Sequence, residues 1–302
     1  MTTAKANLKT ELALLLALAT LWGASYTFIK IGVETIPPVT LIAARTLIAG
    51  GTLLAIMILR GQALPREAAI WRRFLIQACL NSVIPFTLIA WAERSVDAGL
   101  AVILNSTTPI FAFLLTMIIT RHEAITTRKL LGVVAGLAGS CLIIGVEALT
   151  GVGHAVGAQL ALVVATICYG GAAIFGREFK RLDPIMPAAG SLICGAALLL
   201  PVSIAVDRPW TLTPSLASVL ALLCLSILST ALAFVIYFRL VNTLGSVGTT
   251  AQAYLRVPIG VAVGVVFLGE RPTSTDWLGL VCVVAGVAAM TIPARKPGLD
   301  VT

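Results

Sequence analysis

Long apolar stretches separated by short polar connections run through almost the whole chain. Ten of them are long enough to cross the hydrocarbon core of a membrane, about 30 Å, as a helix. They lie at residues 12–30, 39–59, 74–92, 98–120, 130–147, 156–176, 184–206, 215–238, 245–268 and 277–293. Membrane-spanning strands would instead alternate apolar and polar residues over about ten positions. The pattern therefore predicts an all-α polytopic membrane protein with ten transmembrane helices and no soluble domain.

Composition agrees with a membrane protein. Charged residues make up 11% of the chain and hydrophobic residues 59%, with a mean hydropathy of +1.02. A soluble domain carries about a quarter charged residues, so this composition excludes that class. The formal net charge of +8 comes from basic residues scattered between the apolar runs, which argues against a nucleic-acid partner. Basic loops that face lipid headgroups explain the same excess, so the expected partner is the lipid bilayer.

The placement of lysines and arginines predicts the orientation of the chain. With the N-terminus in the cytoplasm, 15 of the 21 basic residues fall in cytoplasmic connections and four fall outside. This bias follows the positive-inside rule and predicts that both termini are cytoplasmic, as for a multi-pass protein of the bacterial inner membrane. The first run follows Lys5 and Lys9 like a signal peptide, but it continues past the cleavage-like Ala17-Leu18-Ala19. We interpret it as an uncleaved span.

The second half of the chain repeats features of the first. At a spacing of 147 residues the matched pairs are Trp22-Gly23 with Tyr169-Gly170, Phe28 with Phe175, Glu123 with Glu270, Gly132 with Gly279, and Ala138-Gly139 with Ala285-Gly286. Pro109 matches Pro258 at a spacing of 149 residues. Each unit would hold five spans, an odd number, so the second copy must insert upside down. We therefore expect two inverted five-helix repeats, residues 1–150 and 151–302, an arrangement typical of transporters.

An arginine and a proline stand close together near the middle of the ninth apolar run. Arg256 lies about twelve residues from each end of the run, roughly 18 Å at 1.5 Å per residue, too deep for its side chain to reach the membrane surface. Two roles fit: a guanidinium that binds a substrate carboxylate through paired hydrogen bonds, or a partner for carbonyls freed by Pro258. Arg45 lies about six residues inside its run and can reach the outer surface, so we expect a structural role for it.

Polar and aromatic residues at the same depth indicate a cavity. Pro109 and Pro258 are each expected to act as a hinge. The polar runs before them, residues 105–108 and 249–252, supply hydrogen-bonding groups either to a cavity or to neighbouring helices. The expected substrate-binding residues are Trp22, Tyr26, Asn81, Asn105, Thr107, Tyr169, Gln252, Tyr254 and Arg256. Trp91 and Tyr237 lie nearer the ends of their runs, which is more typical of the interfacial belt.

Several absences narrow the function. No Asp or Glu lies in the middle of an expected span, and His122 and His154 both lie in connections. Proton-driven carriers usually place such groups on the pathway, so we expect diffusion down a gradient without obligatory proton coupling. The sequence has no P-loop and no HExxH motif, which argues against an ATP-driven pump and against an enzyme. Its six cysteines are scattered through apolar runs without a CxxC pair, so we expect no metal and no cofactor.

Several short motifs resemble those of a known family. They are Leu21-Trp22-Gly23, Thr107-Thr108-Pro109, Arg256-Val257-Pro258, Leu268-Gly269-Glu270-Arg271 and Asp276-Trp277-Leu278-Gly279. Together they resemble the EamA-type branch of the drug/metabolite transporter superfamily, and the overall pattern is similar to bacterial amino-acid exporters of the YddG kind. The resemblance implies two five-helix repeats and export of small molecules by alternating access, above all of aromatic and other bulky neutral amino acids. One departure is Arg121-His122-Glu123, where the family has Gly-Glu.

Other functions stay open on the sequence alone. The substrate could be another metabolite or a drug of the kind that the superfamily exports, and a channel is an alternative to a carrier. A cationic drug would be repelled by Arg256, whereas an amino acid offers it a carboxylate, which favours the amino acid. We expect a monomer, with a dimer as the alternative.

Overall fold

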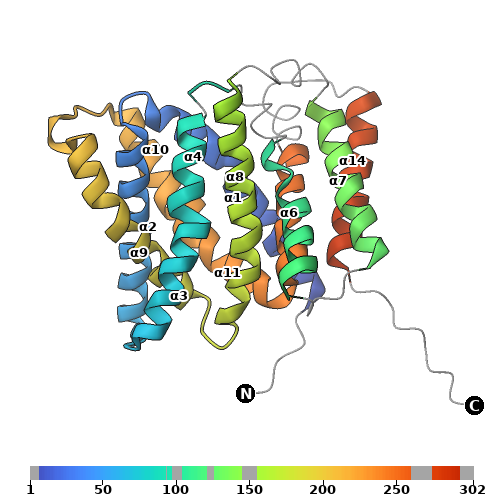
Figure 1. The fold of residues 1–302 in the computed structure, drawn as a ribbon, viewed down its shortest axis with the longest axis horizontal. Coiled ribbons are helices and arrows are strands. Elements are labelled where there is room, and N and C mark those ends of the chain that lie inside the picture. Colours follow the sequence, from blue (N-terminus) through green and yellow to red (C-terminus); the bar gives the residue numbers. More distant parts are fainter. Residues whose placement is uncertain are drawn as a thin grey trace, which may run out of the picture.

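The structure is a computed structural model that describes residues 7–92, 94–96, 104–120, 126–144, 155–259 and 274–292. Within these ranges the regular elements are all helices, which stand side by side in one bundle (Figure 1). Six of the helices in the described part are long and apolar enough to cross a membrane. The prediction of an all-α polytopic membrane protein is confirmed, whereas the count of ten spans stays a prediction.

The long helices have the following bounds. Three are uninterrupted: α1 (Leu8–Val33), α2 (Pro38–Leu59) and α9 (Ile185–Val206). Three are built from consecutive segments. The first runs through α3 (Ala68–Ala78), the π-helical η1 (Cys79–Val83) and α4 (Ile84–Ala92), and the second through α8 (Val156–Phe175) and the 3-10 turn η4 (Gly176–Phe179). The third runs through α10 (Leu216–Ser226), the π-helical η6 (Ile227–Leu232) and α11 (Ala233–Thr243). The shorter elements are α6 (Thr108–Leu115), η2 (Thr116–Thr120), α7 (Thr127–Ile144), η5 (Pro209–Thr211), α12 (Gly245–Thr250) and α14 (Ser274–Thr291).

Polar turn residues explain where several helices begin. Asn7 caps α1, because its side-chain oxygen accepts a hydrogen bond from the Lys9 amide at 3.1 Å. Ser215 caps α10 in the same way through the amide of Ser218, also at 3.1 Å. Such caps satisfy amides that have no partner inside the helix. α2 starts with Pro38 in its first turn, where the missing N–H of proline costs nothing.

Helices from the two halves of the chain pack along each other. α2 lies along α9, and α7 lies along α14 (Figure 1). α8 packs against α4 and α6, while α1 packs against α10 and α11. Gly132 on α7 and Gly286 on α14 let their helices touch, since a Cβ atom on Gly132 would come within 2.8 Å of the Gly286 carbonyl oxygen. Small residues allow this close helix packing, as is common within membranes.

Two of the long helices carry a π-helical segment at matching positions. η1 begins at Cys79 and η6 begins at Ile227, 148 residues later. The same spacing separates Phe86 from Phe234, which lie one to two turns further along. A π-helical segment opens the regular hydrogen-bond ladder and is frequent at functional sites. Both segments contribute to the site described below.

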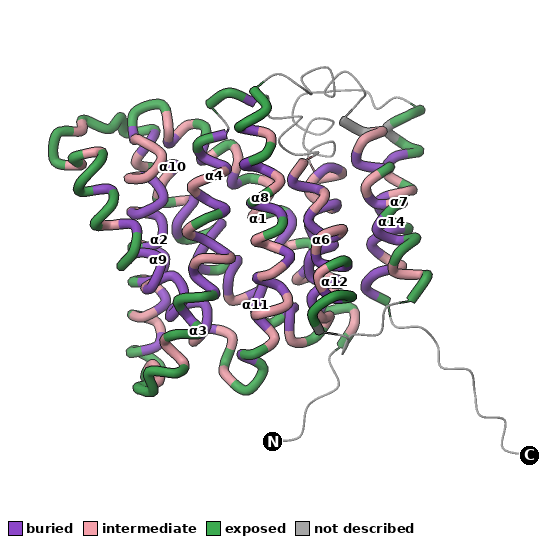
Figure 2. The backbone as a smooth tube through the Cα atoms, in the orientation of Figure 1, coloured by how far each residue is buried: buried purple, intermediate pink, exposed green. Residues whose placement is uncertain are grey.

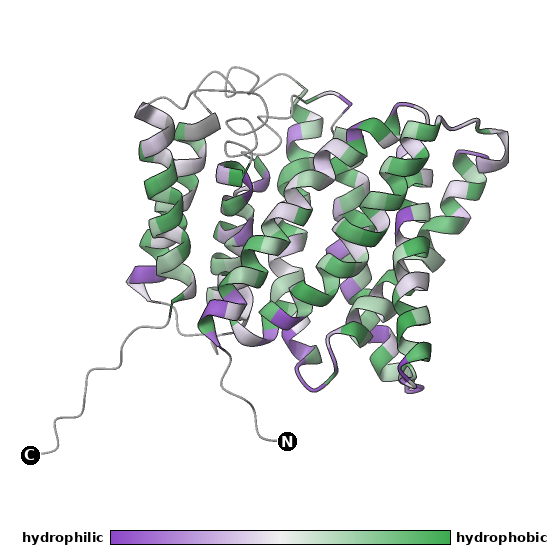
Figure 3. Ribbon diagram, turned by 180° about the vertical axis from the view of Figure 1, so that it is seen from behind, coloured by the Kyte–Doolittle hydropathy of each residue, from purple (hydrophilic) through white to green (hydrophobic). Residues whose placement is uncertain are grey.

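The outward faces of the helices are apolar. Figure 2 shows exposed and half-buried residues along the outside of the bundle, and Figure 3 shows hydrophobic residues through most of its height with hydrophilic ones gathered at the turns. Ile118 is 68% exposed, Leu131 63% and Val281 64%. A contiguous apolar surface of this kind is unfavourable in water and fits contact with hydrocarbon.

Candidate functional site

A cavity lies among the helices, between α1, α2, α4, α8 and α11 and the polar residues at 105–108 and 250–256. Its empty volume is about 620 Å³, the open mouth included. Of the residues that the structure describes, fifteen line it: Trp22, Ser25, Tyr26, Ile29, Arg45, Asn81, Phe86, Ile89, Asn105, Thr108, Tyr169, Tyr237, Thr250, Gln252 and Arg256. Seven of the nine expected substrate-binding residues are thus brought to one cavity from distant parts of the chain.

Arg256 faces this cavity from the helical residues 252–259. Its Nε donates to the Gln252 Oε1 at 3.0 Å, and its Nη1 donates to the Tyr26 hydroxyl at 3.1 Å. The guanidinium carbon lies 5.4 Å from the centre of the Trp22 ring. These partners are neutral, so they hold the guanidinium in place without cancelling its charge. An arginine held in this way can bind a carboxylate through paired hydrogen bonds.

Arg45 is a second guanidinium of the cavity and corrects an expectation. The sequence placed it within reach of the outer surface and predicted a structural role, whereas in the structure it is 2% exposed inside the bundle and lines the cavity. Its Nε donates to the Thr230 hydroxyl at 2.6 Å, and its guanidinium carbon lies 3.8 Å above the Phe86 ring. Thr230 belongs to η6, far along the chain, so no local pattern could have indicated it. Stacking on an aromatic face and a hydroxyl acceptor are among the contacts that stabilise this arginine in the interior.

Aromatic and amide side chains complete the walls. Trp22 donates from its Nε1 to the Ser229 carbonyl oxygen of η6 at 3.1 Å, and its ring centre lies 5.6 Å from that of Tyr237. The Asn105 amide donates to the Tyr26 hydroxyl. Asn81, in η1, is 1% exposed, and its Nδ2 has no hydrogen-bond partner within the described part of the chain. A buried amide donor without a partner is costly and is a natural site for a ligand acceptor.

Two of the expected binding residues lie elsewhere. Tyr254 is fully buried and turns away from the cavity, where its hydroxyl donates to the Val133 carbonyl oxygen on α7 at 2.9 Å. Its ring fills the space left by Gly136, since a Cβ atom there would come within 2.5 Å of the ring. Thr107 donates its hydroxyl to the Leu104 carbonyl oxygen at 2.6 Å and does not line the cavity. Both side chains have packing roles in this structure.

The two prolines expected to act as hinges occupy different settings. Pro109 stands in the first turn of α6, directly after a turn at residues 106–107 that interrupts the helix. Proline is well accommodated at a helix start, so here it marks a break rather than a kink. Pro258 lies inside the helical residues 252–259, and the residues that follow from 260 to 273 lie outside the described part. The hinge role of both stays a prediction.

Several lining residues were missed on the sequence. Tyr237 was ranked below the other aromatic candidates because it lies near the end of its run, but it is 3% exposed and lines the cavity, since α11 continues to Thr243. Ser25, Ile29, Phe86 and Ile89 also line the cavity without having been predicted, whereas Thr108 and Thr250 belong to the two polar runs that were offered as cavity groups. Trp91, by contrast, is 50% exposed and away from the cavity.

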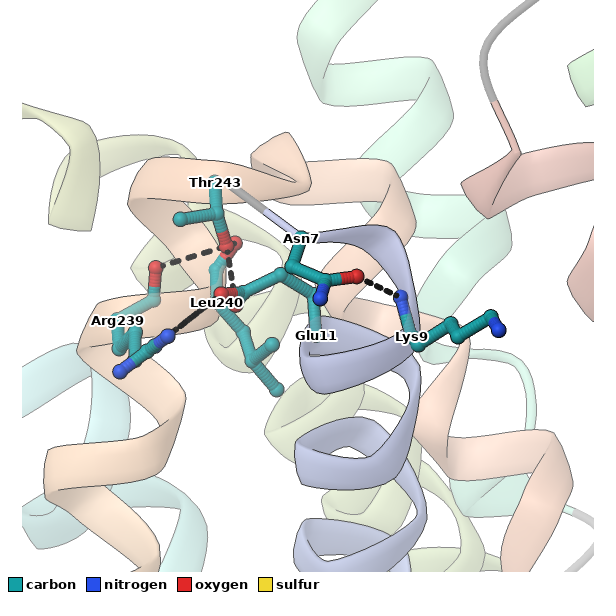
Figure 4. Close-up of polar contacts among 6 residues, drawn as sticks. All are labelled: Asn7, Lys9, Glu11, Arg239, Leu240 and Thr243. Carbon is teal, nitrogen blue, oxygen red and sulfur yellow. Dashed lines mark hydrogen bonds and ion pairs between the residues drawn. The ribbon is translucent and has the colours of Figure 1, made fainter. Parts of the chain in front are cut away.

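A separate polar cluster joins the start of α1 to the end of α11 (Figure 4). The Glu11 carboxylate is 1% exposed. One of its oxygens accepts from the Arg239 Nη2 at 2.8 Å and Nε at 3.2 Å, and the other accepts from the Thr243 hydroxyl at 2.9 Å. The Arg239 side chain is 48% exposed. We call these three residues the α1–α11 clasp.

An apolar helix bundle that encloses a polar, aromatic-walled cavity is the architecture of a membrane transporter. The pattern of the EamA-like transporter family matches residues 9–145 and again residues 156–292. The chain therefore belongs to the EamA-like transporter family. This confirms the membership expected from the motifs and points to a transporter rather than an enzyme.

Known relatives agree with this class. The uncharacterized inner membrane transporter YedA of Escherichia coli (strain K12) is 29% identical over 280 residues, which cover 92% of this chain and 89% of YedA. A probable terminal-alkyne amino-acid exporter of Streptantibioticus cattleyicolor is 29% identical over 214 residues, 70% of this chain and 69% of the exporter. One crystal structure superposes with a TM-score of 0.76 at 19% identity, covering 95% of this chain and 99% of the other. That last likeness concerns the fold alone.

Proposed function

We propose that the protein is a carrier that exports small carboxylate-bearing metabolites, above all aromatic and other bulky neutral amino acids, across the bacterial inner membrane. The observation that carries this proposal is Arg256, a guanidinium in an aromatic-walled cavity with neutral partners. Its charge selects a carboxylate, and the rings of Trp22, Tyr26 and Tyr169 suit a flat apolar side chain. The name of the Streptantibioticus relative, a probable amino-acid exporter, supports the same substrate class.

The proposed mechanism is alternating access between two inverted repeats of five spans, residues 1–150 and 151–302, ten spans in all. Three observations support it. The family pattern matches each half once, π-helical segments recur at matching positions, and α2–α9 and α7–α14 pair helices across the halves. Inverted repeats let the two halves exchange conformations and so expose one site to either side in turn. Both termini then lie in the cytoplasm, and transport proceeds down the substrate gradient without obligatory proton coupling.

Uptake by purified protein in liposomes tests the substrate class. The panel is phenylalanine, methionine, a sugar nucleotide and a lipophilic cation, with Arg256→Ala as the variant and Arg60→Ala, an exposed arginine at the end of α2, as the matched control. We expect saturable uptake of phenylalanine, at least a tenfold loss of kcat/KM in Arg256→Ala, and no change in Arg60→Ala, since losing one charged hydrogen-bond partner costs about 1.5–3 kcal/mol.

Three results would contradict the proposed substrate class or mechanism. Preference for the lipophilic cation, or unchanged phenylalanine kinetics in Arg256→Ala, overturns the carboxylate assignment. Accumulation of phenylalanine above its external concentration, driven by a proton gradient alone, overturns the uncoupled mechanism.

A further inference from the structure

We propose that Asn81 reads the side chain of the transported molecule, so that the protein prefers aromatic amino acids with a hydrogen-bond acceptor on the ring, tyrosine above phenylalanine. This inference rests on the proposed function and adds a substrate preference that Arg256 does not explain. Asn81 lies in the π-helical segment η1 and lines the cavity. It is 1% exposed, and its Nδ2 has no hydrogen-bond partner in the described part of the chain.

The chemistry of the Asn81 Nδ2 determines what can bind it. An unpartnered amide N–H in the interior is costly, because it has lost its hydrogen bonds to water and gained none in return. The group that satisfies it must be an acceptor. The ammonium group of an amino acid is a donor only, and its carboxylate binds the guanidinium of Arg256 more strongly than a neutral amide. The acceptor left for Asn81 is therefore one on the side chain of the substrate.

The surroundings of Asn81 indicate which kind of side chain carries this acceptor. Asn81 and Phe86 line the cavity from one continuous helix; they are five residues apart, roughly 7 Å along the helix axis at 1.5 Å per residue. The Phe86 ring centre lies 6.5 Å from that of Tyr169 on α8, which also lines the cavity. Aromatic rings favour packing against one another, so these two residues suit a substrate ring.

A phenolic hydroxyl fits this arrangement. A short ring substituent together with one hydrogen bond of about 3 Å matches the separation between Phe86 and Asn81. A hydroxyl can accept a hydrogen bond from the Asn81 Nδ2 and can also donate one to the Oδ1. Phenylalanine lacks this group and leaves the amide unpaired.

The matching segment in the second half of the chain supports a special role for this position. Ser229 of η6 lies 148 residues after Asn81, the spacing that relates η1 to η6. Ser229 is also fully buried, and its Oγ also has no hydrogen-bond partner within the described ranges. Its carbonyl oxygen accepts from Trp22, a residue of the cavity wall. Both π-helical segments thus hold an unpartnered polar side chain at the same position, and of the two Asn81 lines the cavity.

Two amino acids that differ only in the ring hydroxyl measure the preference. Liposome uptake by the full-length protein gives kcat/KM for tyrosine and for phenylalanine, and calorimetric titration of the purified protein gives each Kd. We expect tyrosine to be favoured at least tenfold in both measurements, because a buried hydrogen-bonding group discriminates strongly against a ligand that leaves it unpaired.

Substitution then assigns the preference to a residue. Asn81→Leu should reduce the tyrosine-to-phenylalanine ratio to below about threefold. It should not lower the melting temperature in detergent, since it removes an unsatisfied buried donor. The matched control is Asn242→Leu, which should leave the ratio unchanged. Asn242 on α11 also has a buried side-chain atom without a partner among the described residues, but it does not line the cavity.

Three results overturn the inference. Equal values for the two amino acids in the unsubstituted protein do so, and so does an unchanged ratio in Asn81→Leu, which would assign Asn81 to the carboxylate or to the fold. If Asn81→Leu does not fold, Asn81→Ala is judged by the same ratio. The third result is the absence of binding and uptake of both amino acids, which overturns the proposed function as well. Phenylalanine uptake without a preference for tyrosine overturns this inference alone.

Discussion

The arginines of this protein occupy two contrasting environments. In the α1–α11 clasp, Arg239 is ion-paired with a buried carboxylate and is itself half exposed. In the cavity, Arg256 is held by an amide and a hydroxyl, and its charge is not matched by either. Burying a charge is costly unless something compensates it. The charge of Arg239 is compensated within the protein by Glu11, whereas the charge of Arg256 would be compensated by the carboxylate of the proposed substrate.

The clasp also differs from the cavity in what it joins. Glu11 stands in the first turn of α1, and Arg239 and Thr243 stand at the end of α11 in the other half of the chain. The cluster therefore ties two helices whose relative position changes if the halves rock against each other. An ion pair with one half-exposed member can open at modest cost, because water can replace the lost contacts. The comparison teaches that an arginine has to be judged together with the charge of its partners: Arg239 is paired with a carboxylate, whereas Arg256 is hydrogen-bonded to neutral groups and is therefore the one proposed to bind substrate.

The largest expected effect on stability comes from Arg239→Ala. This change leaves the Glu11 carboxylate buried with the Thr243 hydroxyl as its remaining partner among those described. We expect a loss of about 1–3 kcal/mol, below the range for fully buried pairs because Arg239 is half exposed. Thermal unfolding in detergent measures it, as a fall of the melting temperature by several degrees.

A double variant makes this test specific. Adding Glu11→Gln to Arg239→Ala removes the buried charge and should restore most of the lost stability. The KM for phenylalanine uptake should stay within about twofold of the original value in both variants. If the double variant is no more stable than Arg239→Ala, charge burial is not the cause, and the contrast with the cavity fails.

An intermediate effect is expected from Tyr26→Phe. The Tyr26 hydroxyl accepts hydrogen bonds from the Arg256 Nη1 and from the Asn105 amide, so its removal loosens the guanidinium in the cavity. We expect the KM for phenylalanine to rise about threefold to tenfold, the equivalent of one hydrogen bond of about 0.5–1.5 kcal/mol. The melting temperature should change by less than about 2 °C.

The matched control for this prediction is another tyrosine. Tyr254→Phe removes a hydroxyl that donates to the Val133 carbonyl oxygen, outside the cavity. It should lower the melting temperature and leave KM unchanged. The opposite pattern would be a lower melting temperature in Tyr26→Phe and a higher KM in Tyr254→Phe. It would show that Tyr26 has a structural role and that Tyr254 acts in transport.

These residues also show how far sequence reasoning reaches. The helices and the depths of Arg256, Trp22 and Tyr26 within their runs could be predicted, because hydropathy and the cost of a deep charge depend on local sequence alone. The neighbour against which a side chain packs could not. Tyr254 lies two residues, about half a turn, from Gln252 and so points from another face of the helix. Its ring packs against α7, where Gly136 leaves room for it.

The location of Arg45 could not be predicted for a related reason. Its position in α2 is within reach of the outer surface, and the contacts with Thr230 and Phe86 that help to hold it inside involve other helices. The clasp was missed because Glu11 and Arg239 are 228 residues apart, and each taken alone has the pattern of a residue at a span end. Contacts between distant helices determine which polar residues meet, and no periodicity within one helix records them.

The smallest effect is expected from Thr243→Val in the clasp. The change removes the hydroxyl that donates to one Glu11 oxygen at 2.9 Å and keeps the ion pair with Arg239. Because Thr243 is exposed, water can take its place, so we expect a loss of about 0.5–1 kcal/mol, seen as a shift of the melting temperature of a few degrees at most. A loss as large as that of Arg239→Ala would mean that the hydroxyl, rather than the neutralising charge, stabilises Glu11. The two environments would then differ in hydrogen bonding and not in charge, and this comparison would no longer support the role proposed for Arg256.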